Sequence, residues 1–325
     1  MNMLINSATV IIRSVGERTE EVCRALIRAQ GVTDNAIFVV REAPFSQAMR
    51  TSFRIGLDQA RPWTFCIDAD VLLRPGSIQR MLELAEQQPE NVCEIQGYIL
   101  DKFFGGPRAA GNHLYRTALL DRVLEAIPVE GSDIRPEHHT LQAMEAAGFP
   151  WVLVRELVGL HDFEQSYQDI FRTCFVQAHK HSQLTSLFLA IWRAGAGSDL
   201  DYRVALAGYA RGIEHHEEVH IDARSTYFEQ GFNVLGISEK PAMDPSDWPL
   251  SRVEDIILKW NEPEIYRIKF PTKMGLELRP PGLAPYLGRF SNHLKTFGLG
   301  RSVPFALGWL LQRIGQRIQK AVTKP

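Results

Sequence analysis

The chain has 325 residues, of which 45% are hydrophobic, and its formal net charge is −2. This composition supplies a core for one large domain plus an additional segment, and the near-neutral charge argues against nucleic acid as a partner. The cysteines are scattered and form no CxxC pair, which is typical of core thiols in a reducing compartment. Residues 1–16 lack the features of a signal peptide, and no apolar run is long enough to span a bilayer, so we expect a cytosolic protein.

Strands and helices alternate along the first part of the chain. Three apolar runs are typical of strands buried on both faces: residues 8–12, 36–40 and 64–67. Three further stretches have helical patterns: the segment between Thr19 and Gly31, residues 46–60 and residues 77–87. This alternation predicts an α/β fold with a mostly parallel sheet, whose ligands bind at the carboxyl ends of the strands.

Polar side chains stand where these predicted strands end. Arg13, Glu42 and the pair Asp68 and Asp70 all lie at carboxyl ends. The two aspartates flank a single alanine and therefore point the same way from an extended backbone. Two like charges so close are costly unless a cation lies between them, and a divalent ion with oxygen ligands is the usual solution. A solvated pair of aspartates at a turn is the alternative interpretation.

Five short segments follow one another in a distinctive order. They are residues 10–16 (VIIRSVG), 54–60 (RIGLDQA), 65–70 (FCIDAD), 111–120 (GNHLYRTALL) and 136–149 (PEHHTLQAMEAAGF). A predicted strand at residues 151–158 then leads to His161. This order resembles that of a family 2 glycosyltransferase with the GT-A nucleotide-sugar (DXD) fold, over roughly the first half of the chain. The departures indicate a divergent member: Arg13 for a proline, Arg41 and Glu42 for an aspartate pair, Arg54 for an asparagine and Glu137 for the catalytic aspartate.

The resemblance implies a metal-dependent, inverting transferase that moves a hexosyl or related group from a nucleotide-sugar donor, with UDP favoured over GDP or dTDP. Mn²⁺ or Mg²⁺ would be held by Asp70 and His161, with Asp68 acting through water or on the ribose, and would offset charge on the leaving diphosphate. Glu137 would be the general base, with Asp133 as the alternative. The residues implied in donor or nucleotide binding are Arg13, Ser14, Val15, Glu42, Arg54, Asp68 and Gly111.

Other functions stay open at this point. A first-turn glutamate and a strand-end histidine are both common without any catalytic role. Residues 216–220 (HEEVH) satisfy H-E-x-x-H, in which His216 and His220 would bind zinc and Glu217 would be the base of a metallopeptidase. That segment lacks the continuous apolar stripe of a buried peptidase helix. A third possibility is a non-catalytic protein that keeps the fold and binds sugar nucleotides or glycans.

The sequence divides into three predicted regions: a GT-A domain at residues 1–165, a helical appendage at 166–240, and a Pro-rich wrap with a basic end at 241–325. Residues 304–322 place leucines and isoleucines on one arc of a helix, with basic side chains along its edge. Such a helix is typical of docking on an anionic membrane, with packing against the protein's own core as the alternative. We therefore expect a peripheral enzyme on the inner face of the cytoplasmic membrane, acting on a glycan or lipid-linked acceptor in surface polysaccharide synthesis.

Overall fold

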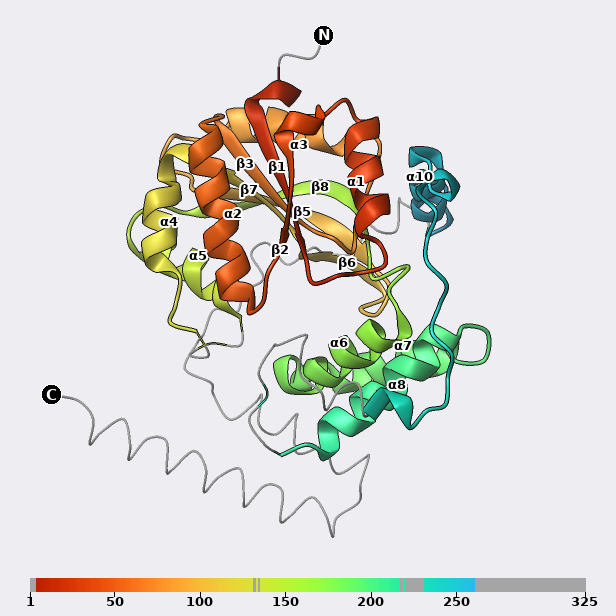
Figure 1. Cartoon of the computed structure of the whole chain (residues 1–325). Coiled ribbons are helices and arrows are strands. Elements are labelled where there is room, and N and C mark those ends of the chain that lie inside the picture. The colour runs from red at the N-terminus through yellow and green to blue at the C-terminus, as the bar shows by residue number, and fades with distance from the viewer. Residues whose placement is uncertain (1–3, 131–132, 134, 217–218, 220–230, 261–325) are drawn as a thin grey trace, which may run out of the picture.

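The computed structural model describes residues 4–130, 133, 135–216, 219 and 231–260. Its first part is an eight-stranded sheet covered by helices on both faces (Figure 1). The strands are β1 (Ala8–Ser14), β2 (Ile37–Arg41), β3 (Trp63–Asp68), β4 (Val71–Leu73), β5 (Glu94–Asp101), β6 (Gly106–Ala109), β7 (Asn112–Arg116) and β8 (Trp151–His161). The helices against them are α1 (Glu20–Ala29), α2 (Phe45–Gln59), α3 (Ser77–Glu86), α4 (Leu120–Ala126) and α5 (Pro136–Ala146).

The sheet is mostly parallel, as the sequence predicts. Its strand order is β2-β1-β3-β7-β5-β8-β4, and β6 also pairs with β5. Strands β1, β2, β3, β5 and β8 run in one direction, and β4, β6 and β7 run against them. The predicted α/β class and the strands at residues 8–12, 36–40 and 64–67 are confirmed. The three opposed strands were not predicted, because runs of three to five residues are too short to show a period.

Helices α1 and α3 cover one face of the sheet, and α2, α4 and α5 cover the other (Figure 1). Adjacent residues of β1 divide between these layers, since Val10 and Ile12 pack with α1 and α3 while Ile11 packs with α2. Burying one such side chain completely contributes about 1.5–3 kcal/mol, which is why both faces of a central strand are apolar. Thr19 precedes α1 as predicted, but its side chain makes no capping hydrogen bond.

A helical extension follows β8, as the sequence predicts. It contains α6 (Tyr167–Lys180), α7 (Thr185–Gly195) and α8 (Leu200–Glu214), which enclose an aromatic core of their own. Within that core Phe188 stacks on Trp192 with ring centroids 5.0 Å apart. The indole nitrogen of Trp192 donates a hydrogen bond of 2.7 Å to the carbonyl of Phe103, which follows β5. The extension is thereby attached to the sheet domain near the carboxyl end of β5.

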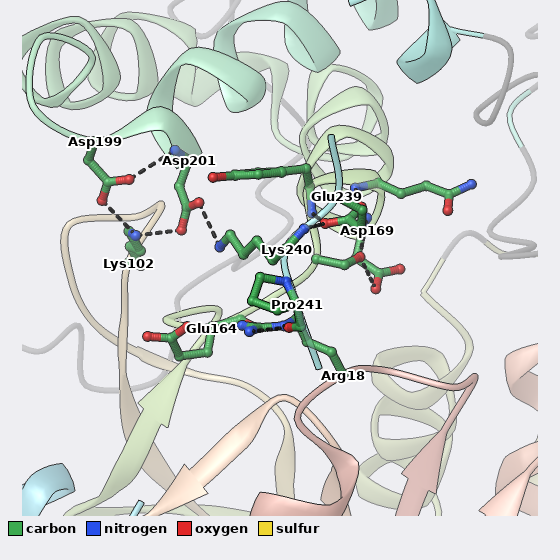
Figure 2. Close-up of polar contacts among 12 residues, drawn as sticks. Arg18, Lys102, Glu164, Asp169, Asp199, Asp201, Glu239, Lys240 and Pro241 are labelled. Carbon is green, nitrogen blue, oxygen red and sulfur yellow. Dashed lines mark hydrogen bonds and ion pairs between the residues drawn. The ribbon is translucent and has the colours of Figure 1, made fainter. Parts of the chain in front are cut away.

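A chain of ion pairs also joins the extension to the sheet domain (Figure 2). Asp201, at the start of α8, contacts Lys102 and Lys240, each at 2.6 Å. Next to Lys240, the carbonyl of Pro241 accepts a hydrogen bond of 2.7 Å from Arg18, which lies between β1 and α1. Residues distant in sequence therefore meet at one joint, and this joint attaches α8 to the sheet domain.

The last described helix, α10 (Leu250–Lys259), packs back on the sheet beside β4 and β8. Arg74 and Glu254 form a paired contact at 2.9 Å that holds it there. No helix among the described residues is both long and apolar enough to cross a membrane. The predicted membrane helix at 304–322, together with Glu217 and His220 of the H-E-x-x-H segment, lies outside the described residues. The predicted boundaries at residues 165 and 240 stay predictions.

Candidate active site

A cavity of about 300 Å³ lies between the carboxyl ends of the strands and helix α6. Arg13 and Ser14 reach it from β1, Glu42 from the loop after β2, and Asp68 from β3. The opposite wall comes from α6, which contributes Arg172, Thr173, Val176, Gln177 and Lys180. A cleft at the carboxyl edge of a largely parallel sheet is where ligands of α/β proteins bind. The position predicted from strand order is therefore where the structure has its cavity.

One group of residues in the described part of the chain can hold a metal ion. Asp70, His161 and Asp162 each offer a ligand atom, and these atoms lie within 4.8 Å of one another. All three residues line the cavity. A histidine nitrogen with carboxylate oxygens suits Mn²⁺ or another divalent ion. Asp68, the other half of the predicted pair, lines the same cavity but is not part of this group.

The environment of Asp70 fits a cation. One carboxylate oxygen, Oδ2, accepts a hydrogen bond of 2.8 Å from Gln165. The other, Oδ1, is buried, has no hydrogen-bond partner among the described residues, and lies 3.6 Å from Nε2 of His161. Burial raises the pKa of Asp70 to about 7, and the neighbouring carboxylates of Asp162 and Asp68 add to the rise. Such a carboxylate is costly to ionise without a positive partner, so a bound divalent ion would relieve a strain already present.

His161 is oriented from behind by carboxylates. Its Nδ1 lies 3.0 Å from an oxygen of Asp101 and 3.0 Å from an oxygen of Asp162. Asp101 is fully buried and held in turn by the backbone amides of Phe103 and Phe104, both at 2.8 Å. A carboxylate on one ring nitrogen fixes the orientation of a histidine and leaves the other nitrogen for a metal. Nε2 of His161 is therefore the nitrogen presented to Asp70.

The backbone around this group is unusual at two positions. Asp162 has φ of 63°, which non-glycine residues adopt rarely and which often marks functional sites. Gly111, with φ also 63°, packs so closely that a Cβ there would lie 2.7 Å from Val71, 3.3 Å from the ring of His161 and 3.4 Å from Asp68. Only glycine fits at position 111 without displacing these neighbours. The predicted donor-side role of Gly111 stays a prediction.

Arg13 links two of the predicted acids. Its Nε donates to Asp68 at 2.9 Å, and its Nη1 and Nη2 donate to the carboxylate of Glu137 at 2.6 and 3.3 Å. Arg13 is buried. The arginine that replaces a proline of the resembled family is therefore an internal cation that holds Asp68 in place. No motif indicated this contact, because residues 13, 68 and 137 meet only after the sheet and α5 assemble.

Glu137 is enclosed by hydrogen-bond donors. Besides Arg13, it accepts from the hydroxyl of Tyr115 at 2.9 Å and lies 2.9 Å from Nε2 of His113. Burial alone would raise the pKa of Glu137, but Arg13 and His113 outweigh burial and hold the pKa well below its usual range. Glu137 does not line the cavity, and neither does the alternative base Asp133. These contacts describe a positioning residue better than a base, and the base role of either acid stays a prediction.

The residues predicted for the nucleoside divide into two groups. Ser14, Val15 and Glu42 line the cavity. They are joined there by Glu17, which the sequence did not indicate and which accepts hydrogen bonds of 2.7 Å from both Ser14 and the amide of Val15. Arg54, in contrast, is exposed on α2 and does not line the cavity. Its predicted role beside the donor stays a prediction.

His113 makes the stability of this network depend on pH. Burial alone would lower the pKa of His113, but Glu137 and Glu94 outweigh it and raise the pKa to about 9. Because the pKa of His113 is higher in the folded than in the unfolded protein, its protonation stabilises the fold. This stabilisation is complete below the unfolded pKa of 6.5 and is lost as the pH rises to about 9. We therefore expect the melting temperature to fall between these pH values, and to fall less in His113→Gln than in the exposed-histidine control His139→Gln. Equal slopes in the two variants would contradict the assigned pKa.

Comparisons with known proteins match this chain to solved structures. No protein-family model matches the chain, and no curated protein sequence matches it. One similar solved structure is a mannosyltransferase from Pyrobaculum calidifontis in complex with GDP-Man and Mn²⁺, at 12% identity and a TM-score of 0.36 over 81% of this chain and 88% of that one. Another is a glycosyltransferase involved in glycosylation of the major capsid of PBCV-1, at 12% identity and 0.33 over 46% and 82%.

A third similar structure is described as a nucleotide-diphospho-sugar transferase from Desulfovibrio desulfuricans G20. It shares 10% identity and a TM-score of 0.32, covering 61% of this chain and 97% of that one. Likenesses at these TM-scores carry no conclusion about this chain.

Proposed function

We propose that this chain is a metal-dependent glycosyltransferase of the GT-A class, which transfers a hexosyl or related sugar from a nucleotide donor with inversion. The observation that carries the proposal is the group of Asp70, His161 and Asp162 in a cavity at the carboxyl edge of the sheet. Asp68 ends strand β3, Asp70 lies in the turn that follows, and both aspartates line that cavity. The nucleotide of the donor is proposed to be UDP in preference to GDP or dTDP.

Different residues of the cavity would bind the metal ion and the nucleoside of the donor. Asp70 and His161 would hold Mn²⁺ or Mg²⁺, which when bound offsets the negative charge of a leaving diphosphate. Glu42 and Glu17 offer carboxylates to the hydroxyls and amide groups of a nucleoside. Arg13 holds Asp68 at the boundary between the metal and nucleoside sites, so that Asp68 can accept from the ribose without rotating away.

The experiment that tests this proposal is a melting-temperature screen of nucleoside diphosphates with and without Mn²⁺. A ligand that binds only the folded state raises the free energy of unfolding, by about 2.7 kcal/mol when the ligand is at a hundredfold excess over Kd. The melting temperature rises as a result. We expect UDP to raise it in the presence of Mn²⁺ and to have little effect without the ion. If every nucleotide stabilises the protein regardless of metal, or if none does, the proposal of a metal-dependent donor site is contradicted.

We also propose, from the sequence alone, that the enzyme docks on the cytoplasmic membrane to reach a glycan or lipid-linked acceptor in surface polysaccharide synthesis. The support is the basic amphipathic pattern of residues 304–322, where each basic side chain near an anionic surface contributes about 1 kcal/mol. The intact protein should co-sediment with anionic liposomes at low salt, and a chain ending at residue 303 should stay in the supernatant. Equal sedimentation of the two would contradict this role of the segment.

A further inference from the structure

Four cationic side chains besides Arg13 line the cavity. The cationic side chains come from β6, from the start of α5 and from α6, and they are Arg108, Arg135, Arg172 and Lys180. Two of them have acidic partners, because Arg108 pairs with Asp101 at 2.5 Å and Arg172 pairs with Asp169 at 3.1 Å. Arg135 and Lys180 form no ion pair with any described residue, and the carboxylates of Asp133 and Asp68 act on them only from a distance. Two cations without an ion-pair partner among the described residues therefore face one cavity.

The position of Lys180 is costly without a ligand. The side chain is half-buried at the end of α6, and burial lowers its pKa to about 7, with Arg135 and Arg108 adding to the effect. Its neighbour His181 is neutral, since burial and Arg135 lower the pKa of that histidine to about 3, and it offers no compensating charge. Cations held together away from water are stable only when an anion accompanies them. The arrangement is that of an anion site.

The cations differ in how they are connected to the metal group of the same cavity. Arg108 pairs with Asp101 at 2.5 Å, and the same carboxylate oxygen lies 3.0 Å from Nδ1 of His161. Arg135 and Lys180, in contrast, form no ion pair with the described metal-group residues Asp70, His161 and Asp162. A diphosphate bound to a metal at Asp70 would leave Arg135 and Lys180, the basic half of the cavity, for a second group.

We infer that the basic half binds a phosphate group of the acceptor, so that the sugar is transferred to a phosphorylated substrate. This assignment rests on the proposed glycosyltransferase function. Two cations without ion-pair partners match the two charges of a phosphate ester or diphosphate, and the guanidinium of Arg135 can bind two phosphate oxygens at once. Lys180 comes from the helical extension and Arg135 from the start of α5, so the sheet domain and the extension would hold the acceptor phosphate together. Free phosphate and a phosphate carried on an acceptor share this chemistry.

The first part of the test measures anion binding without metal or nucleotide. Sulfate is the probe, because it remains a dianion over the working pH range, and calorimetry measures its affinity. We expect Lys180→Met and Arg135→Gln each to weaken sulfate binding about tenfold or more, and the exposed-arginine control Arg193→Gln to leave it unchanged. Lys180→Met should also raise the melting temperature of the ligand-free protein, which loss of a merely structural side chain would not do. Unchanged sulfate affinity in both cavity variants would overturn the anion site.

The second part distinguishes acceptor phosphate from donor diphosphate. Sulfate is titrated into protein saturated with UDP and Mn²⁺, and the result expected is binding with affinity within about threefold of that in the free protein. Competition between UDP and sulfate would mean that the cations hold the donor, and would overturn the assignment to the acceptor. If UDP does not bind at all, the proposed function fails and the acceptor assignment fails with it, while the anion site is judged by the first part alone.

Discussion

Asp70→Asn is expected to abolish the metal-dependent part of nucleotide binding and to leave the fold intact. Asparagine keeps the size of the side chain and can still accept the hydrogen bond from Gln165, but its neutral oxygen is a poor ligand for a divalent ion. Because altering even the groups that orient metal ligands costs 10–100-fold, we expect a loss of about a hundredfold or more in apparent Mn²⁺ affinity. Calorimetric titration of Mn²⁺ in the presence of UDP measures it.

The matched control is Asp58→Asn, which removes an exposed aspartate of α2 far from the cavity lining. It should bind Mn²⁺ and UDP as the wild type does. His161→Ala should reproduce the loss seen in Asp70→Asn, since the two side chains face each other across 3.6 Å. If either cavity variant keeps the metal dependence of the wild type, that residue is not a ligand.

Glu137→Gln is expected to lower the free energy of unfolding by about 3–5 kcal/mol, the usual effect of removing one partner of a buried ion pair. Arg13 would keep its charge in a buried position, and Arg13 and His113 would both lose the carboxylate that compensates them. Urea denaturation measures the change. The control Glu125→Gln, on the exposed surface of α4, should change stability by less than about 0.5 kcal/mol. A stable Glu137→Gln protein would contradict the ion-pair network.

The same variant also tests the predicted base. If Glu137 removes the proton of the acceptor hydroxyl, the folded variant should bind donor normally and lose turnover about a hundredfold. Asp133→Asn separates the two candidates, because Asp133 contacts only the amide of Arg135 and the ring of His139 among described residues and should be replaceable without loss of stability. Normal turnover in folded Glu137→Gln would leave Asp133 as the candidate, and normal turnover in both would exclude both acids.

The strands that are buried on both faces were predictable, because such strands have continuous apolar sequences. β1 and β3 read as strands for that reason. The extended backbone expected through Asp70 is not present, because β3 ends at Asp68 and Asp70 lies in the turn that follows, although both side chains line the cavity. The motif that contains Arg54 suggested a place beside the donor. Arg54 is exposed on α2 and outside the cavity lining, and its donor role stays a prediction.

The remaining site residues depend on tertiary packing. Asp162 follows the predicted histidine, and only its left-handed backbone and its closeness to Asp70 single it out. Arg135 and Lys180 are 45 positions apart in the sequence, and they face one cavity because the extension docks through Lys102 and Trp192. No local sequence pattern predicts that these two side chains face one cavity. From sequence alone, a cation near the end of a helix is expected to be exposed to solvent.

The central claim is that a divalent ion binds at Asp70 and His161. A crystal structure of the full chain with Mn²⁺ and UDP, recorded where manganese scatters anomalously, tests it most directly. The account predicts an anomalous peak about 2.0–2.3 Å from a carboxylate oxygen of Asp70 and from Nε2 of His161, in contact with the diphosphate. A manganese peak held by other side chains, or UDP bound in the cavity with no manganese beside it, would contradict the account.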